Sequence, residues 1–357
     1  MADKDLDSLR ADIDALDDQI LDLLNRRAEV AQKVGRFKAE NAQTYYVPNR
    51  ERAIYERLSM RNPGPFPNDA VRKVFREIIS ASLSLEQPLK VAFLGPKATF
   101  THVAAMQQFG LSAQLVAQKG ISQVFDEVER GRAEFGVVPV ENSNEGIVSH
   151  TLDMFMDSQL KINAEILLEI SHDLLTLDGA MSSVQRVCSH PQALAQCRNW
   201  LEENLPDVPL VDVSSTALAA QMAAEDPSVA AVASEAAGNL YGLQVAKSKI
   251  EDHPNNFTRF LVVGRSMPKP TGKDKTSIMF SVKDEPGILY RMLEPFSSRQ
   301  INLSKIESRP MKRKAWEYIF FLDMEGHVEE GTVSGALDDL QQYCQFIKVL
   351  GSFPRGR

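Results

Sequence analysis

Arg27 stands where the spacing of the apolar residues near the start of the chain predicts a hydrophobic side chain. The apolar residues recur in alternating steps of three and four, at Leu6, Leu9, Ile13, Leu16, Ile20, Leu23, Val30, Val34 and Phe37. An arginine on such a face needs an anionic partner, because burying its charge without one costs free energy. Arg10, Lys38 and Arg50 would add positive charge to the same interior, which suits a small dianion. The other interpretation is a dimerising coiled coil with one tolerated arginine.

Polar side chains also interrupt the apolar face of a later segment, residues 68–85. That face runs through Val71, Val74, Phe75, Ile78 and Ile79. One helical turn further on it presents Ser82, and after one more turn it presents Glu86. Polar groups therefore enter apolar faces on two different predicted helices.

In the middle of the chain, polar residues follow short apolar runs. They include Thr99, Glu141, Asn142, Ser143, the triplet Ser214–Thr216, Thr258 and Arg259. Ser, Thr and Asn after a strand are preferred helix N-caps, and that interpretation takes most of Ser214–Thr216 and Thr99. The run from Glu141 to Ser143 is denser in functional groups than a cap requires, and Arg259 suits a substrate carboxylate.

The elements that position these residues follow from periodicity. The first apolar series predicts one helix over about residues 6–40, roughly 50 Å long at about 1.5 Å per residue. A helix of that length exceeds a small domain, so we expect it to pack along the same helix of a second subunit. Two shorter helices follow, over about 50–58 and 68–85, joined by a Pro/Gly loop.

The pattern changes after Pro88. Apolar runs of four to six residues alternate with helical stretches, which predicts mostly parallel sheets with ligands at the strand ends. About 175 residues of this pattern favour two lobes with a cleft between them. The first loop reads GPKATF rather than GxGxxG, which argues against a dinucleotide-binding dehydrogenase. Beyond a linker at 266–276, the order strand, helix, strand, strand, helix, strand predicts a ferredoxin-like βαββαβ module.

Composition limits the classes of function. The chain has 357 residues, 43% hydrophobic and 25% charged, which is ordinary for two or three globular domains. A net charge of −8 argues against sequence-independent binding to nucleic acid or to an anionic membrane. Three scattered cysteines fit neither a disulfide framework nor a zinc site. With no membrane-length apolar run and an acidic start unlike a signal peptide, we expect a soluble, cytoplasmic protein.

The first segment resembles the all-helical chorismate mutases, which are intertwined homodimers. The resemblance covers about residues 5–88 and rests on LRADIDALDDQILDLLNRRAEVAQKVGRFK followed by RER. It implies that Arg10, reaching in from the partner subunit, and Arg27 hold the two carboxylates of chorismate. It also implies that Lys38 contacts a carboxylate and the ether oxygen, that Glu51 binds the ring hydroxyl, and that Arg50 and Ser82 support the pocket. A pericyclic rearrangement needs a folded substrate and charge aimed at the breaking bond, which fixed cations supply.

Two positions depart from that family's pattern. Val47 stands where an aspartate is frequent, so that only a backbone contact survives there. Glu86 stands where a glutamine often faces the ether oxygen, and a carboxylate cannot donate a hydrogen bond whereas the protonated acid can. We therefore predict that Glu86 works protonated and that mutase activity rises toward acid pH.

The middle segment resembles prephenate dehydratase, whose two α/β lobes are similar to periplasmic-type binding proteins. The motifs are FLGPKATFTHVAA, PVENSNEGIV, SHPQALAQC and NNFTRFLVVG, in that order across about 90–266. The resemblance makes Thr258 the essential threonine, which would donate a hydrogen bond to the leaving hydroxyl. It implies a substrate cleft formed by Thr99, Glu141, Asn142, Ser143, Thr258, Arg259 and Phe260.

The last segment resembles the phenylalanine-binding ACT module, on the motifs DEPGIL and INLSKIESRP. The resemblance implies an L-phenylalanine site at Gly287, Ile288, Leu289, Asn302, Glu307, Ser308 and Arg309. It also implies feedback inhibition, with L-phenylalanine binding the less active conformation better.

Taken in order, the three resemblances match the bifunctional chorismate mutase–prephenate dehydratases. We expect an all-helical mutase domain at 1–88, a two-lobed dehydratase domain at 89–266 and an ACT domain at 275–357. The expected reactions are chorismate to prephenate and then prephenate to phenylpyruvate, in a homodimer or higher homo-oligomer with no metal or organic cofactor. Three alternatives stay open: an amino-acid-sensing regulator without catalysis, a protein with only one active domain, and a preference for arogenate over prephenate.

Overall fold

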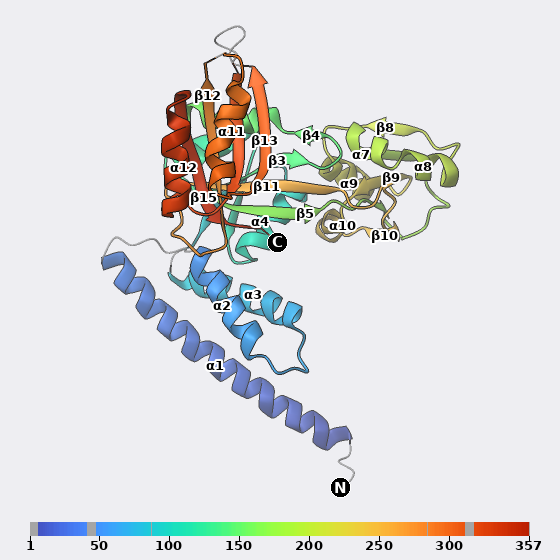
Figure 1. Cartoon of the computed structure of the whole chain (residues 1–357). Helices are drawn as coiled ribbons and strands as arrows, with labels where there is room; N and C mark the ends of the chain where they lie inside the picture. Colours follow the sequence, from blue (N-terminus) through green and yellow to red (C-terminus); the bar gives the residue numbers. More distant parts are fainter. Residues whose placement is uncertain (1–5, 41–47, 87, 284, 311–317, 357) are drawn as a thin grey trace. The chain divides into compact units, whose positions relative to one another are not determined.

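The computed structural model describes residues 6–40, 48–86, 88–283, 285–310 and 318–356 (Figure 1). The chain forms two compact units, which are described separately. The first contains residues 1–89 and 109–114, and the second contains 90–108 and 115–357.

The first unit is helical, as the sequence predicts. Helix α1 covers Leu6–Glu40, α2 covers Pro48–Arg61 and α3 covers Asn68–Glu86. Helix α2 is longer than predicted and begins at Pro48, a residue favoured in the first turn of a helix. Helices α1 and α3 approach closely at Gly35, where an added Cβ would lie 2.9 Å from the Glu86 side chain.

The apolar seam of α1 is largely uncovered within one chain. Its leucines, isoleucines and valines keep between 42% and 62% of their surface exposed, from Val34 at one extreme to Leu6 at the other. Fully exposing a row of large apolar residues is unfavourable, because about 25 cal/mol is gained for each Å² removed from water. The helix therefore presents a face that needs a partner.

The second unit contains three sheets. The first sheet has the order β2-β1-β3-β11-β5, with β4 paired to β3. Its strands are β1 (Lys90–Leu94), β2 (Gln114–Gln118), β3 (Phe135–Asn142), β4 (Gly146–Ile147), β5 (Lys161–Glu169) and β11 (Phe257–Gly264). The second sheet has the order β10-β6-β9-β7-β8. Its strands are β6 (Asp173–Thr176), β7 (Arg186–Ser189), β8 (Leu210–Asp212), β9 (Val229–Ala233) and β10 (Gln244–Lys247).

The expectation of mostly parallel sheets is wrong for part of each lobe. Strand β1 pairs with β3 in parallel, and β7 pairs in parallel with both β8 and β9. Strand β11, however, returns from the second lobe and inserts antiparallel between β3 and β5. Strands β6 and β10 are also antiparallel to their neighbours. The returning strand ties the two lobes together.

Helices pack around these two sheets. They are α4 (Phe100–Phe109), α5 (Ile121–Glu129), α6 (Ser149–Asp157), α7 (Pro191–Gln196), α8 (Arg198–Asn204), α9 (Thr216–Glu225) and α10 (Glu235–Tyr241). Ser215 caps α9 by accepting a hydrogen bond from the Leu218 backbone nitrogen at 3.0 Å, as the capping interpretation predicts.

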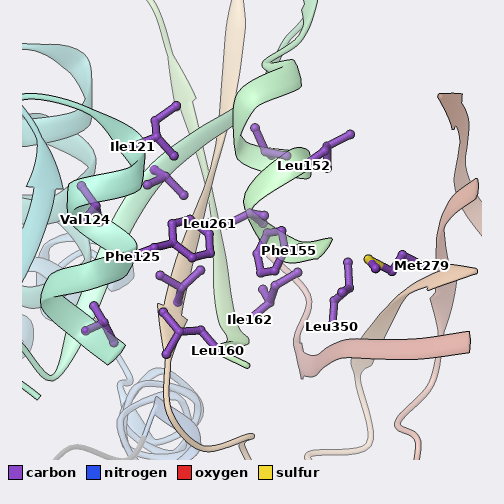
Figure 2. Packing of buried hydrophobic residues seen from close by; sticks show 14 of the residues in the cluster. Ile121, Val124, Phe125, Leu152, Phe155, Leu160, Ile162, Leu261, Met279 and Leu350 are labelled. Atoms are coloured by element: carbon purple, nitrogen blue, oxygen red, sulfur yellow. The ribbon is translucent and has the colours of Figure 1, made fainter. Parts of the chain in front are cut away.

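The third sheet has the order β13-β14-β12-β15 and the predicted βαββαβ topology. Its elements are β12 (Asp274–Val282), α11 (Ile288–Ser298), β13 (Leu303–Pro310), β14 (Tyr318–Glu325), α12 (Gly331–Gln341) and β15 (Cys344–Pro354). Helices α11 and α12 pack on one face of the sheet (Figure 1). The other face joins the core of the first lobe, where Met279 and Leu350 lie in one apolar cluster with Phe155 and Ile162 (Figure 2).

Within the described residues, no helix combines the length and the apolar character needed to cross a membrane. No group of three or more His, Cys, Asp or Glu side chains in those ranges is placed to hold a metal ion. The three cysteines are unpaired, with Cys188 and Cys197 buried and Cys344 partly buried.

Candidate active sites

The first cluster of predicted site residues lies between α1 and α3. The Arg27 guanidinium hydrogen-bonds to the Ser82 hydroxyl and to the backbone oxygen of Ile78, at 3.4 Å in the second case. The Ser82 hydroxyl in turn donates to the same Ile78 oxygen at 2.7 Å. Burial lowers the pKa of Arg27, against the opposing effect of the nearby Glu86 carboxylate. The polar residues that interrupt the two apolar faces therefore meet, as expected.

Lys38 and Glu86 form the second half of this cluster. The Lys38 Nζ lies 3.6 Å from Glu86 Oε2, and the two side chains are only 19% and 6% exposed. Glu86 Oε2 accepts no hydrogen bond from the described residues. Because Glu86 also acts electrostatically on Arg27, it is the anion shared by both cations when no substrate is bound. The carboxylates of a dianionic substrate could pair with the same two cations in place of Glu86.

Arg10 lies apart from this cluster. It sits on α1, 17 residues before Arg27, which places the two about 25 Å apart along the helix. Its side chain is exposed and pairs with Asp7 at 3.3 Å. Arg10 and Arg27 of one chain therefore cannot hold the same small molecule.

Arg50 and Glu51 lie in the first turn of α2, which begins at Pro48. Arg50 is exposed, and burial raises the pKa of Glu51 to about 8. At neutral pH the Glu51 side chain is therefore mainly a neutral acid, which can donate a hydrogen bond to a hydroxyl. Val47 lies outside the described residues.

The second candidate site is a cleft in the other unit. A cavity of about 410 Å³, ordinary for a small-molecule site, is lined by both lobes. The first lobe and its returning strand contribute Thr99, Phe100, Asn142, Glu145, Ile147, Thr258 and Phe260 among others. The second lobe contributes His190, Gln192, Gln196 and Ser214–Thr216, while His172 comes from the crossing segment between the lobes.

A chain of hydrogen bonds between side chains connects the two lobes beside Thr258 and ends at Glu145. Asn142 Nδ2 donates to Thr258 Oγ1 at 2.9 Å and to Asn256 Oδ1 at 2.8 Å. Asn256 Nδ2 donates to Gln196 Oε1 at 3.1 Å, and the same oxygen lies 2.9 Å from His172 Nε2. Gln196 Nε2 donates to Glu145 Oε1 at 3.0 Å.

This network assigns the direction of the Thr258 proton. Asn142 Oδ1 accepts from the backbone nitrogens of Asn144 and Glu145 at 2.9 and 3.1 Å, so the other amide atom facing Thr258 must be the nitrogen. Thr258 Oγ1 therefore accepts from Asn142, and its own O–H is available to donate into the cavity that it lines. Thr258 is 9% exposed and is held in place by β11.

The same reasoning fixes the state of His172. Gln196 Oε1 accepts hydrogen bonds because Gln196 Nε2 is already a donor, so His172 Nε2 must carry a proton. His172 is 3% exposed, and burial lowers its pKa, which keeps the ring neutral. His172 Nδ1 is buried and has no hydrogen-bond partner among the described residues.

Three residues predicted for the cleft lie elsewhere. Strand β11 directs Thr258 and Phe260 into the cavity and Arg259 to the opposite face, since successive side chains of a strand alternate. Arg259 pairs there with Glu165 and Asp323, at 2.8 and 2.7 Å. Burial acts to lower its pKa, but Asp323 and Glu165 outweigh burial and raise it.

Glu141 and Ser143 are also outside the cavity lining. Glu141 Oε2 lies 2.7 Å from the Lys305 ammonium of the third sheet. Ser143 Oγ accepts a hydrogen bond from the Phe257 backbone nitrogen at 3.0 Å, which fastens the loop to the start of β11. Thr99 lines the cavity as predicted, and its hydroxyl donates to the Pro96 oxygen at 2.9 Å.

The sequence reasoning missed His172, Gln196 and Asn256 as partners of Thr258. Gln192 and Gln196 are four residues apart, so they share one face of α7, and that spacing was an available signal. Asn256 stands two residues before Thr258, on the same side of an extended chain. Nothing local marked His172, which follows β5.

The residues predicted to bind L-phenylalanine surround α11 and β13. Gly287 has a φ of +78°, a conformation that favours glycine, and precedes α11. Leu289 and Ser308 are exposed, and Asn302 donates to Glu325 at 3.0 Å. Arg309 instead reaches the first lobe, where it pairs with Asp153 of α6 at 2.7 Å. Ile288 and Glu307 are partly buried.

Comparison with known proteins agrees with this arrangement. Residues 9–87 match the chorismate mutase type II family, residues 91–268 match prephenate dehydratase, and residues 276–341 match the ACT domain. A bifunctional chorismate mutase/prephenate dehydratase of Aquifex aeolicus is 52% identical over 99% of this chain and 98% of its own length. The protein of the same name from Pseudomonas aeruginosa is 44% identical and covers 99% of both chains.

A solved structure is similar as well. The crystal structure of prephenate dehydratase in complex with L-Phe from Arthrobacter aurescens superposes with a TM-score of 0.69 and 37% identity. The match covers 75% of this chain and 90% of that one. The identities over the full length and the order of the three domains lead to one conclusion: the chain belongs to the family of bifunctional chorismate mutase/prephenate dehydratases.

Proposed function

We propose that the cluster between α1 and α3 rearranges chorismate to prephenate, and that the two-lobed cleft converts prephenate to phenylpyruvate. The single observation that carries the second assignment is the Thr258 hydroxyl, which accepts a hydrogen bond from Asn142 and lines the cavity, so that its proton is available to donate there. Arogenate differs from prephenate by an amino group in place of a keto group, and prephenate is the substrate we assign. The three free cysteines support a location in the cytoplasm.

In the helical unit, fixed charges suffice for the chemistry. The rearrangement breaks a carbon–oxygen bond and forms a carbon–carbon bond without a nucleophile, so positioning and charge stabilisation are what the protein contributes. Arg27 binds one carboxylate with support from Ser82, and Lys38 lies where it can stabilise the ether oxygen as negative charge develops. Glu51, as a neutral acid, donates to the ring hydroxyl.

In the cleft, the reaction releases carbon dioxide and water. The ring carboxylate is lost as carbon dioxide, the electron pair of that bond moves through the ring, and the C–O bond of the ring hydroxyl breaks. The departing hydroxide takes up a proton to leave as water. Thr258 donates a hydrogen bond to that oxygen, and the neutral network behind it holds its orientation. Phe260 and Ile147 give the aromatic product an apolar wall.

The mutase sites are shared between two subunits. Arg10 and Arg27 of one helix are about 25 Å apart, so Arg10 can complete a site that contains Arg27 only from a second copy. The exposed apolar seam of α1 supports this arrangement, because pairing two such helices buries it. The homodimer is therefore the smallest active form.

L-Phenylalanine inhibits the dehydratase by binding to the ACT module. Support comes from the Arthrobacter aurescens relative, which was crystallised with L-Phe, and from the ACT match of residues 276–341. In this chain the left-handed Gly287 turn, the exposed Leu289 and the edge strand β13 form the surface on which we place the ligand.

One incubation tests the proposed function. Purified protein is given chorismate at pH 7, and prephenate and phenylpyruvate are followed separately with and without L-phenylalanine. Phenylpyruvate formation that L-phenylalanine suppresses is the expected result. Accumulation of prephenate alone would contradict the dehydratase assignment. Conversion of added prephenate without conversion of chorismate would contradict the mutase assignment.

A further inference from the structure

Strand β13 of the ACT module contacts the dehydratase lobe at two points. Lys305 Nζ lies 2.7 Å from Glu141 Oε2, and Arg309 Nη1 donates to the Ser149 oxygen at 2.6 Å and to Asp153 Oδ1 at 2.7 Å. Lys305 and Arg309 are four residues apart on one strand, so their side chains leave the same face. Both are mostly buried, with 15% and 19% of their side-chain surface exposed, which makes these pairs more than ordinary surface contacts.

The two contacts lie on either side of the segment that lines the cleft. Glu141 precedes this segment, Ser149 and Asp153 follow it in α6, and residues 142 and 145–148 between them line the cavity. Asn142 holds the Thr258 hydroxyl, while Glu145 accepts hydrogen bonds from Gln192 and Gln196 of the other lobe. A shift of this segment would therefore change the hydrogen bond that holds the Thr258 hydroxyl and the contacts that join the two lobes.

The other contacts between the ACT module and the dehydratase come from different strands. Asp323 of β14 pairs with Arg259, and Lys275 of β12 pairs with Glu165, both near the shared apolar core. Lys348 of β15 donates to backbone oxygens of Phe155 and Ser158 at 2.8 and 2.6 Å. Strands β12 and β14 lie inside the sheet, whereas β13 and β15 are its two edge strands. Strand β15 is fastened to β5, where Lys161 Nζ donates to the Val349 oxygen at 2.6 Å, and β13 pairs only with β14 among the described strands. Strand β13 is therefore an edge strand that contacts the first lobe through the side chains of Lys305 and Arg309.

Two of the residues expected to bind the effector, Glu307 and Ser308, stand between Lys305 and Arg309. We propose that β13 transmits the effector signal to the dehydratase cleft through the pairs Lys305–Glu141 and Arg309–Asp153, which position the segment 142–148. This inference rests on the proposed inhibition by L-phenylalanine. A ligand that binds better to one position of β13 shifts the equilibrium between the two positions of the cleft segment. The size of that shift is set by the ratio of its affinities for the two positions.

The substitution Asp153→Asn tests this route because Asp153 lies outside the cavity and outside the proposed effector surface. The full-length protein is assayed for dehydratase velocity with and without saturating L-phenylalanine, for L-phenylalanine binding by calorimetry, and for mutase rate. We expect the velocity without effector to stay within about two-fold of wild type and L-phenylalanine still to bind. We expect the inhibition to fall at least about five-fold, the lower end of typical coupling factors.

Asp226→Asn is the matched control. Asp226 also accepts from an arginine, Arg186, at 2.8 Å, but this pair lies within the second lobe and does not reach the ACT module. Inhibition of the Asp226→Asn variant by L-phenylalanine is expected to equal that of wild type. The substitution Lys305→Met interrupts the other contact and is expected to reduce inhibition as Asp153→Asn does. The dehydratase velocity without effector, measured on the same samples, shows that the unit carrying the substitutions is folded, and the mutase rate shows the same for the helical unit.

The outcomes separate this inference from the regulation on which it rests. Wild-type protein that neither binds L-phenylalanine nor is inhibited by it would overturn both. Wild-type inhibition that persists unchanged in Asp153→Asn and in Lys305→Met, with normal L-phenylalanine binding, would overturn the transmission route alone. Equal loss of inhibition in the Asp226→Asn control would also overturn it, because the effect would then not depend on β13.

Discussion

The helical unit and the dehydratase cleft hold their functional groups with different kinds of side chain, charged in the first and mainly neutral in the second. Between α1 and α3, charged groups meet, with Arg27 and Lys38 both near Glu86. In the cleft, Thr258 is held by neutral amides and a neutral imidazole. The first site must compensate a substrate dianion, whereas the second must direct one hydroxyl proton. Charged side chains therefore suit the first proposed reaction, and neutral hydrogen-bonding side chains suit the second.

The two sites differ in completeness as well. The residues of the Thr258 network lie within hydrogen-bond distance of one another in a single chain. In the helical unit, Arg10 lies about 25 Å from Arg27 along the same helix, and the apolar seam of α1 is exposed. If the mutase site is shared between subunits as proposed, the mutase activity depends on dimer assembly and the dehydratase activity does not.

The largest effect is expected from Thr258→Val. Valine keeps the shape of threonine but removes the hydroxyl, so dehydratase kcat should fall on the order of 10²- to 10⁴-fold. The mutase rate of the same protein should be unchanged, because the cleft and the helical cluster share no residue. Thr258→Ser, which restores a hydroxyl, serves as the control. A loss below about five-fold in the valine variant would show that the hydroxyl is not needed.

Asn142→Asp should give the next largest effect. The carboxylate would accept a hydrogen bond from Thr258 in place of the amide that now donates to it, and the Thr258 proton would turn away from the cavity. We expect dehydratase kcat to fall about 10- to 100-fold, the equivalent of a hydrogen bond to a charged group, with little change in KM. Equal rises in KM and falls in kcat would indicate a binding role for Asn142 instead.

The pH dependence of the mutase should follow Glu51. Burial raises its pKa to about 8, so mutase activity should fall several-fold as the pH rises from 7 to 9 and the donor is lost. In Glu51→Gln the profile should be flat over this range. The unfolded carboxyl titrates near 4.5, so this group makes folding progressively less favourable as the pH rises from about 4.5 to 8, and the loss of stability persists above pH 8. A profile in Glu51→Gln that still falls above pH 8 would assign the titration to another group.

Glu86→Gln is expected to have the smallest effect. The amide supplies a permanent donor toward the ether oxygen, so the mutase rate at pH 7 should rise a few-fold and should depend less on acid pH than in wild type. The pair with Lys38 would be lost, which offsets part of the gain. Without substrate Glu86 is the anion between Arg27 and Lys38, so the prediction requires it to take up a proton when chorismate binds. Mutase rates that are flat from pH 5 to 8 in both proteins would contradict this prediction.

Local periodicity predicted the elements well, and the site less well. The steps of three and four along the first segment predicted a helix over about 6–40, and α1 covers Leu6–Glu40. The prediction that Thr258 and Arg259 share the cleft was wrong, although the two-residue period of a strand already places neighbours on opposite faces. The prediction that Glu141 lines the cleft was wrong for the same reason. Glu141 lies opposite Arg259 on the neighbouring strand, so its side chain leaves the same face of the sheet as that of Arg259.

Other features lay beyond the reach of local patterns. His172 and Gln196 come from segments more than 50 residues away from Thr258, and only the return of β11 into the first sheet brings them together. The contacts of Lys305 and Arg309 with the dehydratase lobe depend on how the third sheet packs on the first. No spacing along the chain encodes such tertiary contacts.

The central claim, a mutase site shared by two chains and a dehydratase cleft complete in one, is tested most directly by mixing defective subunits. Arg10→Ala and Arg27→Ala chains, each tagged differently, are co-expressed and the mixed dimers are purified. One site of a mixed dimer then contains both arginines, and the other contains neither. The account predicts that each parent has lost most mutase activity, that the mixed dimer recovers about half of the wild-type rate, and that dehydratase activity is unchanged throughout. Mixed dimers without any recovery of mutase activity would contradict it.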